Sequence, residues 1–179
     1  MTVPEDVIRQ ADERTFASIL PGDGLGVDAI ATTGVPWSTA DNLVTPCGTE
    51  SLRITSWHSL GGASRTWTLT DDTLIEQYSE AYYGETGAEV IHLIRATVTC
   101  SSEPRTGVNV SVKAIPPGIG GDDNAYIVCE IAEKARCSGL LARDNVVTRI
   151  LVRAISLSRA ENILRSILPR AHALLLRAW

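Results

Sequence analysis

Acidic and aromatic residues alternate along "TLIEQYSEAYY", residues 73 to 83. If this stretch is a strand, Glu76, Tyr78, Glu80 and Tyr82 share one face, because successive side chains of a strand point to opposite faces. The glutamates are acid–base candidates, and the phenol rings could form the walls of a site. We expect a pocket if that face looks into a concave sheet, and a solvated face if it looks outward.

Two arginines share one face of the last expected strand, "NVVTRILVRA". Arg149 and Arg153 stand four residues apart on one face of this strand, so they could hold an anionic ligand. The alternative is cross-strand pairing with a carboxylate. The carboxylates that could pair with them are Glu76, Glu80 and Glu130.

His58 follows Trp57 at the end of an expected strand, a position that often borders a cleft. It is therefore a general-base candidate beside Glu76 and Glu80, and a solvated turn histidine is the alternative. No G-x-S-x-G motif is present, and "PGDGLG" fits neither common phosphate-binding loop. The sequence thus implies no cofactor and no defined reaction.

The four cysteines are Cys47, Cys100, Cys129 and Cys137. A structural zinc site or a redox dithiol would show a closer pair than these, and neither is expected. Four buried thiols in a reducing compartment remain one interpretation. Two disulfides are the favoured one, with Cys129 bonded to Cys137 across neighbouring antiparallel strands and Cys47 bonded to Cys100.

Length and charge narrow the classes of protein. A chain of 179 residues with 44% apolar content can bury one full core, so we expect one domain. The net charge of −5 and the absence of a basic run exclude nucleic acid as an expected partner. No apolar run reaches the roughly 20 residues that cross a bilayer. The start "MTVPED" lacks a secretion signal, so we expect a cytoplasmic protein, or an extracellular or cell-envelope one if a signal was removed.

The pattern of elements predicts an α+β fold. Residues 1–20 contain a helix, and 21–179 form a single domain with a sheet over 50–155 and a C-terminal helix over 158–178. Gly61 and Gly62 predict a hairpin turn, and the valines of "VNVSVKA" are expected to face inward. Capping boxes are expected at Thr86 with Glu89, starting an internal helix that ends at Cys100, and at Ser158 with Glu161.

Pro169 should kink or break the C-terminal helix, because proline lacks an N–H and crowds the preceding turn. The curved antiparallel sheet should have about five to seven strands, with the internal helix and the long C-terminal helix packed on one face.

Several of these segments resemble a known family. "PCG" at 46–48, the helix that ends at Cys100, and "CSGLLARDNVV" before the last strand resemble the extracellular sensor domain of the mycobacterial kinase PknH and its actinobacterial lipoprotein relatives. That resemblance implies a secreted α+β domain with a cleft, two disulfides and a small-molecule ligand. The family places its fourth cysteine after the last strand, where this chain has "RAISLS", so here Cys129 would rewire the second bridge.

The leading hypothesis is a non-enzymatic, sensor-like domain that binds a small molecule in a cleft on the sheet. The expected lining residues, beside Arg149 and Arg153, are Trp57, Trp67, Tyr78, Tyr82 and Tyr126. The alternative is a cytosolic cyclase or isomerase of a small hydrophobic metabolite, which uses a shaped pocket and one acid–base residue. A third interpretation is a docking module or homodimer formed through the C-terminal helix.

Overall fold

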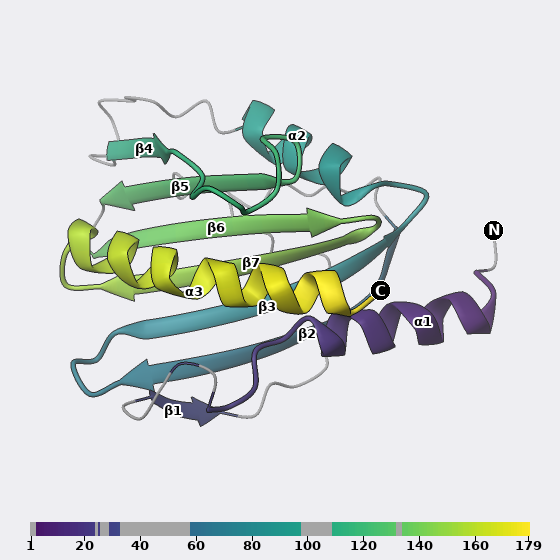
Figure 1. Cartoon of the computed structure of the whole chain (residues 1–179), viewed down its shortest axis with the longest axis horizontal. Helices are drawn as coiled ribbons and strands as arrows, with labels where there is room; N and C mark the ends of the chain where they lie inside the picture. The colour runs from purple at the N-terminus through teal and green to yellow at the C-terminus, as the bar shows by residue number, and fades with distance from the viewer. Residues whose placement is uncertain (1–2, 24, 26–28, 33–57, 98–108, 132–133) are drawn as a thin grey trace.

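The computed structural model describes residues 3–23, 25, 29–32, 58–97, 109–131 and 134–179. Within these residues the chain forms a seven-stranded sheet in which every neighbouring pair is antiparallel, in the order β1-β2-β3-β7-β6-β5-β4 (Figure 1). The strands are β1 (Ala29–Thr32), β2 (His58–Leu69), β3 (Leu74–Tyr83), β4 (Asn109–Lys113), β5 (Ala125–Ile131), β6 (Ala135–Arg143) and β7 (Val146–Ala154). The α+β fold predicted from the sequence is confirmed.

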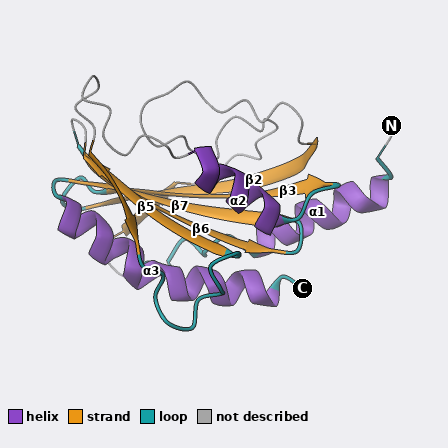
Figure 2. Ribbon diagram, turned by 90° about the horizontal axis from the view of Figure 1, so that it is seen from above, coloured by secondary structure: helices purple, strands orange, loops and turns teal. Residues whose placement is uncertain are grey.

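The three helices within the described residues cover the sheet from two sides. Helices α1 (Glu5–Ala17) and α3 (Leu157–Arg177) lie on one face, and α2 (Gly87–Thr97) lies on the other (Figure 2). The sequence had suggested that the internal helix and the C-terminal helix pack on the same face. This was wrong, because α2 and α3 lie on opposite faces. The reason is that β5, β6 and β7 are buried on both faces, so two apolar surfaces need a cover.

Each face of the sheet has its own hydrophobic core. Trp67, Ile150 and Leu164 belong to the core beneath α1 and α3. Val90 and Ile94 of α2 pack in the second core, against aromatic and aliphatic side chains of the strands. The capping box that starts α2 is confirmed, because Thr86 Oγ1 accepts a hydrogen bond from the Glu89 N–H and Glu89 Oε2 accepts one from the Thr86 N–H.

Gly61 and Gly62 do not form a hairpin turn, which corrects the sequence prediction. Both lie inside the long strand β2, and the register with β3 shifts between Ser59 and Gly61. Gly61 has φ of +138°, and a Cβ on Gly62 would lie 2.7 Å from the carbonyl oxygen of Ser79. These glycines therefore permit a bulge and a close approach of two strands, and the true turn lies at Asp71–Asp72.

The disulfide between Cys129 and Cys137 is confirmed. The two residues lie directly opposite each other on β5 and β6, with Cα atoms 4.0 Å apart, and both are fully buried. It joins two neighbouring strands beneath α3. The other two cysteines of the expected framework, Cys47 and Cys100, lie outside the described residues.

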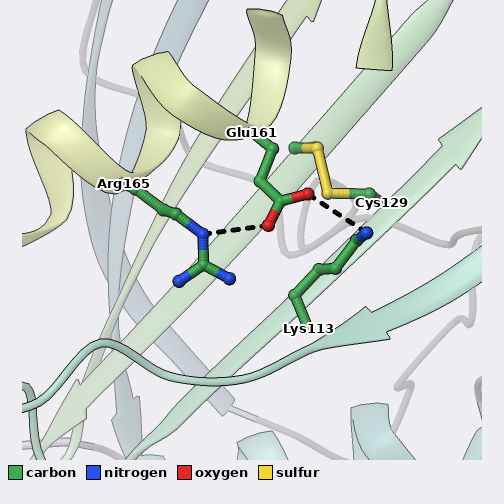
Figure 3. Close-up of polar contacts among 5 residues, drawn as sticks. Lys113, Cys129, Glu161 and Arg165 are labelled. Atoms are coloured by element: carbon green, nitrogen blue, oxygen red, sulfur yellow. Dashed lines mark hydrogen bonds and ion pairs between the residues drawn. A yellow bond between two sulfur atoms is a disulfide. The ribbon is translucent and has the colours of Figure 1, made fainter. Parts of the chain in front are cut away.

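An ionic network next to this disulfide ties α3 to the edge strand β4 (Figure 3). Glu161 accepts from Lys113 Nζ at 3.1 Å and from Arg165 Nε at 2.9 Å. Glu161 is therefore not part of a capping box with Ser158. The helix cap lies two residues earlier, where Ser156 Oγ accepts a hydrogen bond from the N–H of Arg159.

Two further expectations about β4 and α3 need correction. Lys113 points toward α3, whereas Val112 on the opposite face is 63% exposed, so the valines of β4 do not simply face inward. Helix α3 continues through Pro169 as one element of 21 residues rather than breaking into two. Packing of its buried face against β5, β6 and β7 offsets the missing backbone donor.

Buried polar contacts attach α1 to the centre of the sheet. Ser18 Oγ donates to Ser79 Oγ at 2.8 Å, and Ser79 in turn contacts Thr148 Oγ1. The side-chain amide of Gln77 donates to the carbonyl of Ser18 and accepts from the N–H of Leu20. Because all these groups are paired, the N-terminal helix packs on the sheet without leaving unsatisfied polar atoms at this contact.

Candidate functional site

The face of the sheet that α2 partly covers carries a group of charged and phenolic side chains, here called the polar face. Residues paired across the strands lie on one face, so the register places these side chains together. The polar face consists of Glu76, Tyr78, Glu80 and Tyr82 on β3, Arg149 and Arg153 on β7, Arg136 on β6, and Glu130 on β5.

One end of the polar face is a buried carboxylate beside two phenols. Glu80 is fully buried, and Tyr82 donates its phenolic hydrogen to Glu80 Oε2 at 2.8 Å. Burial first, and the nearby Glu80 charge second, raise the pKa of Tyr82 and of Tyr78 well above the ordinary value for tyrosine. Both phenols therefore remain protonated donors at neutral pH.

Arg149 lies at the centre of the polar face, directly opposite Tyr78. It is only 9% exposed, and burial lowers its pKa to about 10, while the carboxylate of Glu76 acts in the opposite direction. Glu76 also forms an ion pair with Arg153, with 3.2 Å between Glu76 Oε2 and Arg153 Nη2. Charges of opposite sign thus follow one another from Arg153 through Glu76 to Arg149.

The sequence offered two uses for these arginines, ligand binding or pairing across strands. Pairing with Glu76 is confirmed for Arg153, and Glu130 pairs with Arg136 of the neighbouring strand β6. Arg136 and Arg153 are direct cross-strand neighbours, and Glu76 and Glu130 flank this pair of cations from the outer strands β3 and β5 and balance their charge.

The expected aromatic lining is only partly brought together. Tyr78, Tyr82 and Tyr126 belong to the same core beneath α2. Trp67 lies on the opposite face of the sheet, fully buried, and donates its indole N–H to the carbonyl of Gly22. Trp57 lies outside the described residues, and the backbone of His58 pairs with Tyr83 at the start of β2.

A cavity of about 730 Å³ lies at one end of the sheet, where three chain reversals meet. The β2–β3 turn, the end of β5, the start of β6 and the start of α3 are all at this end, on the left in Figure 1. We call it the sheet-end cavity. Its lining residues are Asp71, Asp72, Leu74, Ile131, Lys134, Ala135, Arg153, Ala154, Ile155, Ser156 and Leu157.

The chemistry of the sheet-end cavity is amphipathic. Arg153 and Lys134 supply cationic groups, and Ile155, which is 83% exposed, is the most accessible of its aliphatic side chains. The volume lies within the range of small-molecule sites, about 300 to 1,000 Å³. Arg153 belongs to both the cavity and the polar face, so it connects the two through Glu76.

A smaller cavity of about 400 Å³ lies between the end of α2 and strands β4 and β5. Tyr126 lines it, and the guanidinium of Arg95 lies 5.3 Å from that ring and donates to the carbonyl of Ala125 at 3.0 Å. These contacts engage Arg95 within the fold. The smaller cavity therefore offers a less accessible cation than the sheet-end cavity does.

Among the described residues, no three histidine, cysteine or acidic side chains gather in a way that could hold a metal ion. None of the described helices is both long and apolar enough to cross a membrane.

Sequence reasoning found Arg153 and missed Asp72, Lys134 and Ile155 of the same cavity. These three residues come from separate turns and carry no motif. A turn signal was present in the "TDDT" segment at 70–73, where Asp72 adopts φ of +60°. That signal predicts a turn, but it does not predict which other turn lies beside it.

Comparisons with known proteins show what this fold is similar to. No protein-family model and no curated protein matches the chain. Over 91% of this chain and 97% of the other, the structure is similar to the extracellular domain of PknH from Mycobacterium tuberculosis, with a TM-score of 0.56 and 14% identity. It is also similar to an uncharacterized protein from Mycobacterium smegmatis (Rv0999 ortholog), with a TM-score of 0.55 and 11% identity over 94% and 98% of the two chains. The resemblance suggested by the sequence is thus confirmed at the level of the fold.

Proposed function

We propose that this chain is a sensor-like domain that binds a small molecule bearing a carboxylate and an apolar group. The ligand occupies the sheet-end cavity, with its carboxylate at Arg153 and Lys134 and its apolar part against Ile131, Ile155 and Leu157. The observation that carries this proposal is the cavity itself, which combines cations and accessible aliphatic side chains in a volume of about 730 Å³.

The ion pair between Arg153 and Glu76 supplies a route by which binding is sensed. A ligand carboxylate competes with Glu76 for Arg153, and Glu76 is then freer to interact with Arg149. Arg149 lies opposite Tyr78 in the centre of the sheet, so a change at the cavity alters the balance of charge along the polar face.

An extracellular location accompanies this function. A disulfide between buried cysteines is typical of oxidising compartments, and the similar PknH domain is extracellular. Alkylation of protein isolated from its native host, followed by mass spectrometry, tests the location. Bonded Cys129 and Cys137 are expected, whereas alkylation of both residues before reduction would contradict it.

Binding of isocaproate, measured by isothermal titration calorimetry, tests the function directly. Isocaproate has one carboxylate and a branched apolar chain, and its neutral amide isocaproamide is the matched probe. We expect isocaproate to bind and isocaproamide to bind more weakly. Lys134→Gln and Arg153→Gln should each weaken isocaproate binding roughly 3- to 10-fold, because a charge-assisted hydrogen bond at a half-exposed site contributes about 1 kcal/mol.

Arg9→Gln is the control variant, since Arg9 is exposed on α1 and does not line the cavity. Equal binding of the acid and the amide would contradict anion recognition, and so would an equal loss in all three variants.

A cofactor-independent enzyme of the isomerase or cyclase type is the second candidate. The hydrogen bond from Tyr82 to the buried carboxylate of Glu80 favours it, because such a pair can move a proton in a dry site. Neither residue lines either of the two cavities found among the described residues, which favours the binding domain. A turnover that Glu80→Gln abolishes, with isocaproate binding retained, would support the enzyme instead.

A further inference from the structure

The sheet-end cavity carries charges of both signs on opposite sides. Asp71 and Asp72 of the β2–β3 turn line one side, and Lys134, which directly precedes β6, lines the other. Strand β7 lies between β3 and β6, and it contributes Arg153. A ligand that uses only the cations would leave the acidic side of the cavity without a partner.

The two aspartates differ in their availability. Asp71 pairs with Arg159 at 2.5 Å, and its Oδ1 accepts a hydrogen bond from the N–H of Thr73 at 3.2 Å. Asp72 is exposed and takes part in no ion pair among the described residues. Lys134 is likewise exposed and unpaired within the part of the chain that the structure describes. The cavity thus presents one available carboxylate and one available ammonium.

The spacing of these groups suits a small zwitterion. Strands β3 and β6 are separated by two strand intervals, or roughly 10 Å between backbones. Asp72 and Lys134 both line the cavity at this end of the sheet. An extended residue adds about 3.5 Å to the length of a ligand, so one or two residues fit between the charges.

The apolar lining supplies the remaining recognition. Ile131 is 42% exposed and Ile155 is 83% exposed, and both line the cavity with Leu74 and Leu157. Covering such accessible aliphatic side chains is favourable for a ligand with an aliphatic side chain of its own.

We propose that the ligand of the sheet-end cavity is a zwitterion with an aliphatic side chain, either a free amino acid or a short peptide with a free amino terminus. Asp72 accepts the α-ammonium group, and Lys134 and Arg153 hold the carboxylate. This inference rests on the proposed function and adds to it the class of ligand.

Four probes and one substitution test it by calorimetry. The probes are isocaproate, leucine, leucyl-leucine and N-acetyl-leucyl-leucine, and isocaproate is leucine without its amino group. Leucine or leucyl-leucine should bind about five- to tenfold more tightly than isocaproate, because a charged hydrogen bond is added. Asp72→Asn should remove that advantage, while isocaproate should bind at least as tightly as before, because the substitution takes a negative charge out of the cavity lining. Asparagine tolerates the positive φ of this position, so the turn is retained.

Each outcome decides the inference. The tighter binder, leucine or the dipeptide, identifies the source of the zwitterion, and acetylation should abolish the advantage of the dipeptide. If isocaproate binds and both amino compounds bind no more tightly, the inference is overturned while the proposed function stands. If none of the four binds, both are overturned. Asp123→Asn, at an exposed position, is the control. The role of Asp72 would also be contradicted if the tighter binding of the amino compounds were retained in Asp72→Asn and lost in Asp123→Asn.

Discussion

Glu76 forms an ion pair with Arg153 at 3.2 Å, and the charge of the same carboxylate raises the pKa of the buried guanidinium of Arg149. Arg153 lines the sheet-end cavity, whereas Arg149 is at the centre of the polar face. One side chain therefore links the accessible end of the sheet to its interior, and a change in its pairing affects both.

Replacing Glu76 should change binding and stability in opposite directions. Glu76→Gln removes the internal competitor for Arg153, so isocaproate should bind roughly 3- to 10-fold more tightly. It also removes a counter-charge from Arg149, so urea denaturation should show a free energy of unfolding lower by about 1 to 2 kcal/mol. Glu13→Gln, at an exposed position of α1, is the control. Weaker or unchanged binding in Glu76→Gln would refute the coupling.

Removal of the disulfide should lower stability without abolishing the fold. The combined Cys129→Ala and Cys137→Ala variant loses a staple between residues eight apart in sequence, beneath α3. The loop-entropy model gives about 2.5 kcal/mol for such a loop, or a melting temperature lower by roughly 5 to 10 °C. Calorimetric melting without reductant measures this. A shift below about 1 °C would show that the disulfide contributes little.

The buried phenols predict a dependence on alkaline pH. The pKa values of Tyr78 and Tyr82 are raised in the folded protein, mainly by burial and then by the Glu80 charge. Their contribution to stability is fully present below the unfolded pKa of about 10, and it is lost as the pH rises above that value. Ultraviolet titration should show that these two phenols ionise only above about pH 10, at the pH at which the protein unfolds. Tyr82→Phe should remove one late-ionising phenol, and ionisation of both residues near pH 10 in the folded state would disprove the assignment.

Gly62 should not tolerate a side chain. A Cβ there would lie 2.7 Å from the carbonyl of Ser79 and 3.1 Å from the hydroxyl of Tyr78. Gly62→Ala should therefore destabilise the fold by about 1 to 3 kcal/mol and disturb Tyr78. Gly121→Ala is the matched control, because nothing lies within 4 Å of its added Cβ. Equal thermal stability of the two variants would contradict the close approach of β2 and β3.

Features that depend only on neighbouring residues or on two adjacent strands could be predicted from the sequence. Alternation placed Glu76, Tyr78, Glu80 and Tyr82 on one face, and the spacing of Cys129 and Cys137 predicted a disulfide between neighbouring strands. Both inferences needed only the periodicity of a strand and the geometry of a hairpin.

Predictions were wrong where a sequence pattern is compatible with more than one local structure. A Gly-Gly pair fits a turn or a bulge, and only the approach of Ser79 from β3 determines which. Ser156 and Ser158 are both competent caps, and the pairing of Glu161 with Lys113 on a distant strand decides between them. The lining residues of the sheet-end cavity come from three separate parts of the chain, so no single segment carries a pattern that predicts the cavity.

Mapping of amide chemical shifts during an isocaproate titration tests the central claim most directly. We predict that the largest changes fall at residues 71–74, 131, 134–135 and 153–157, which surround the sheet-end cavity. Saturable changes there would confirm the site. Changes centred instead on Arg95 and Tyr126 at the smaller cavity, or no saturable change at any amide, would contradict the account.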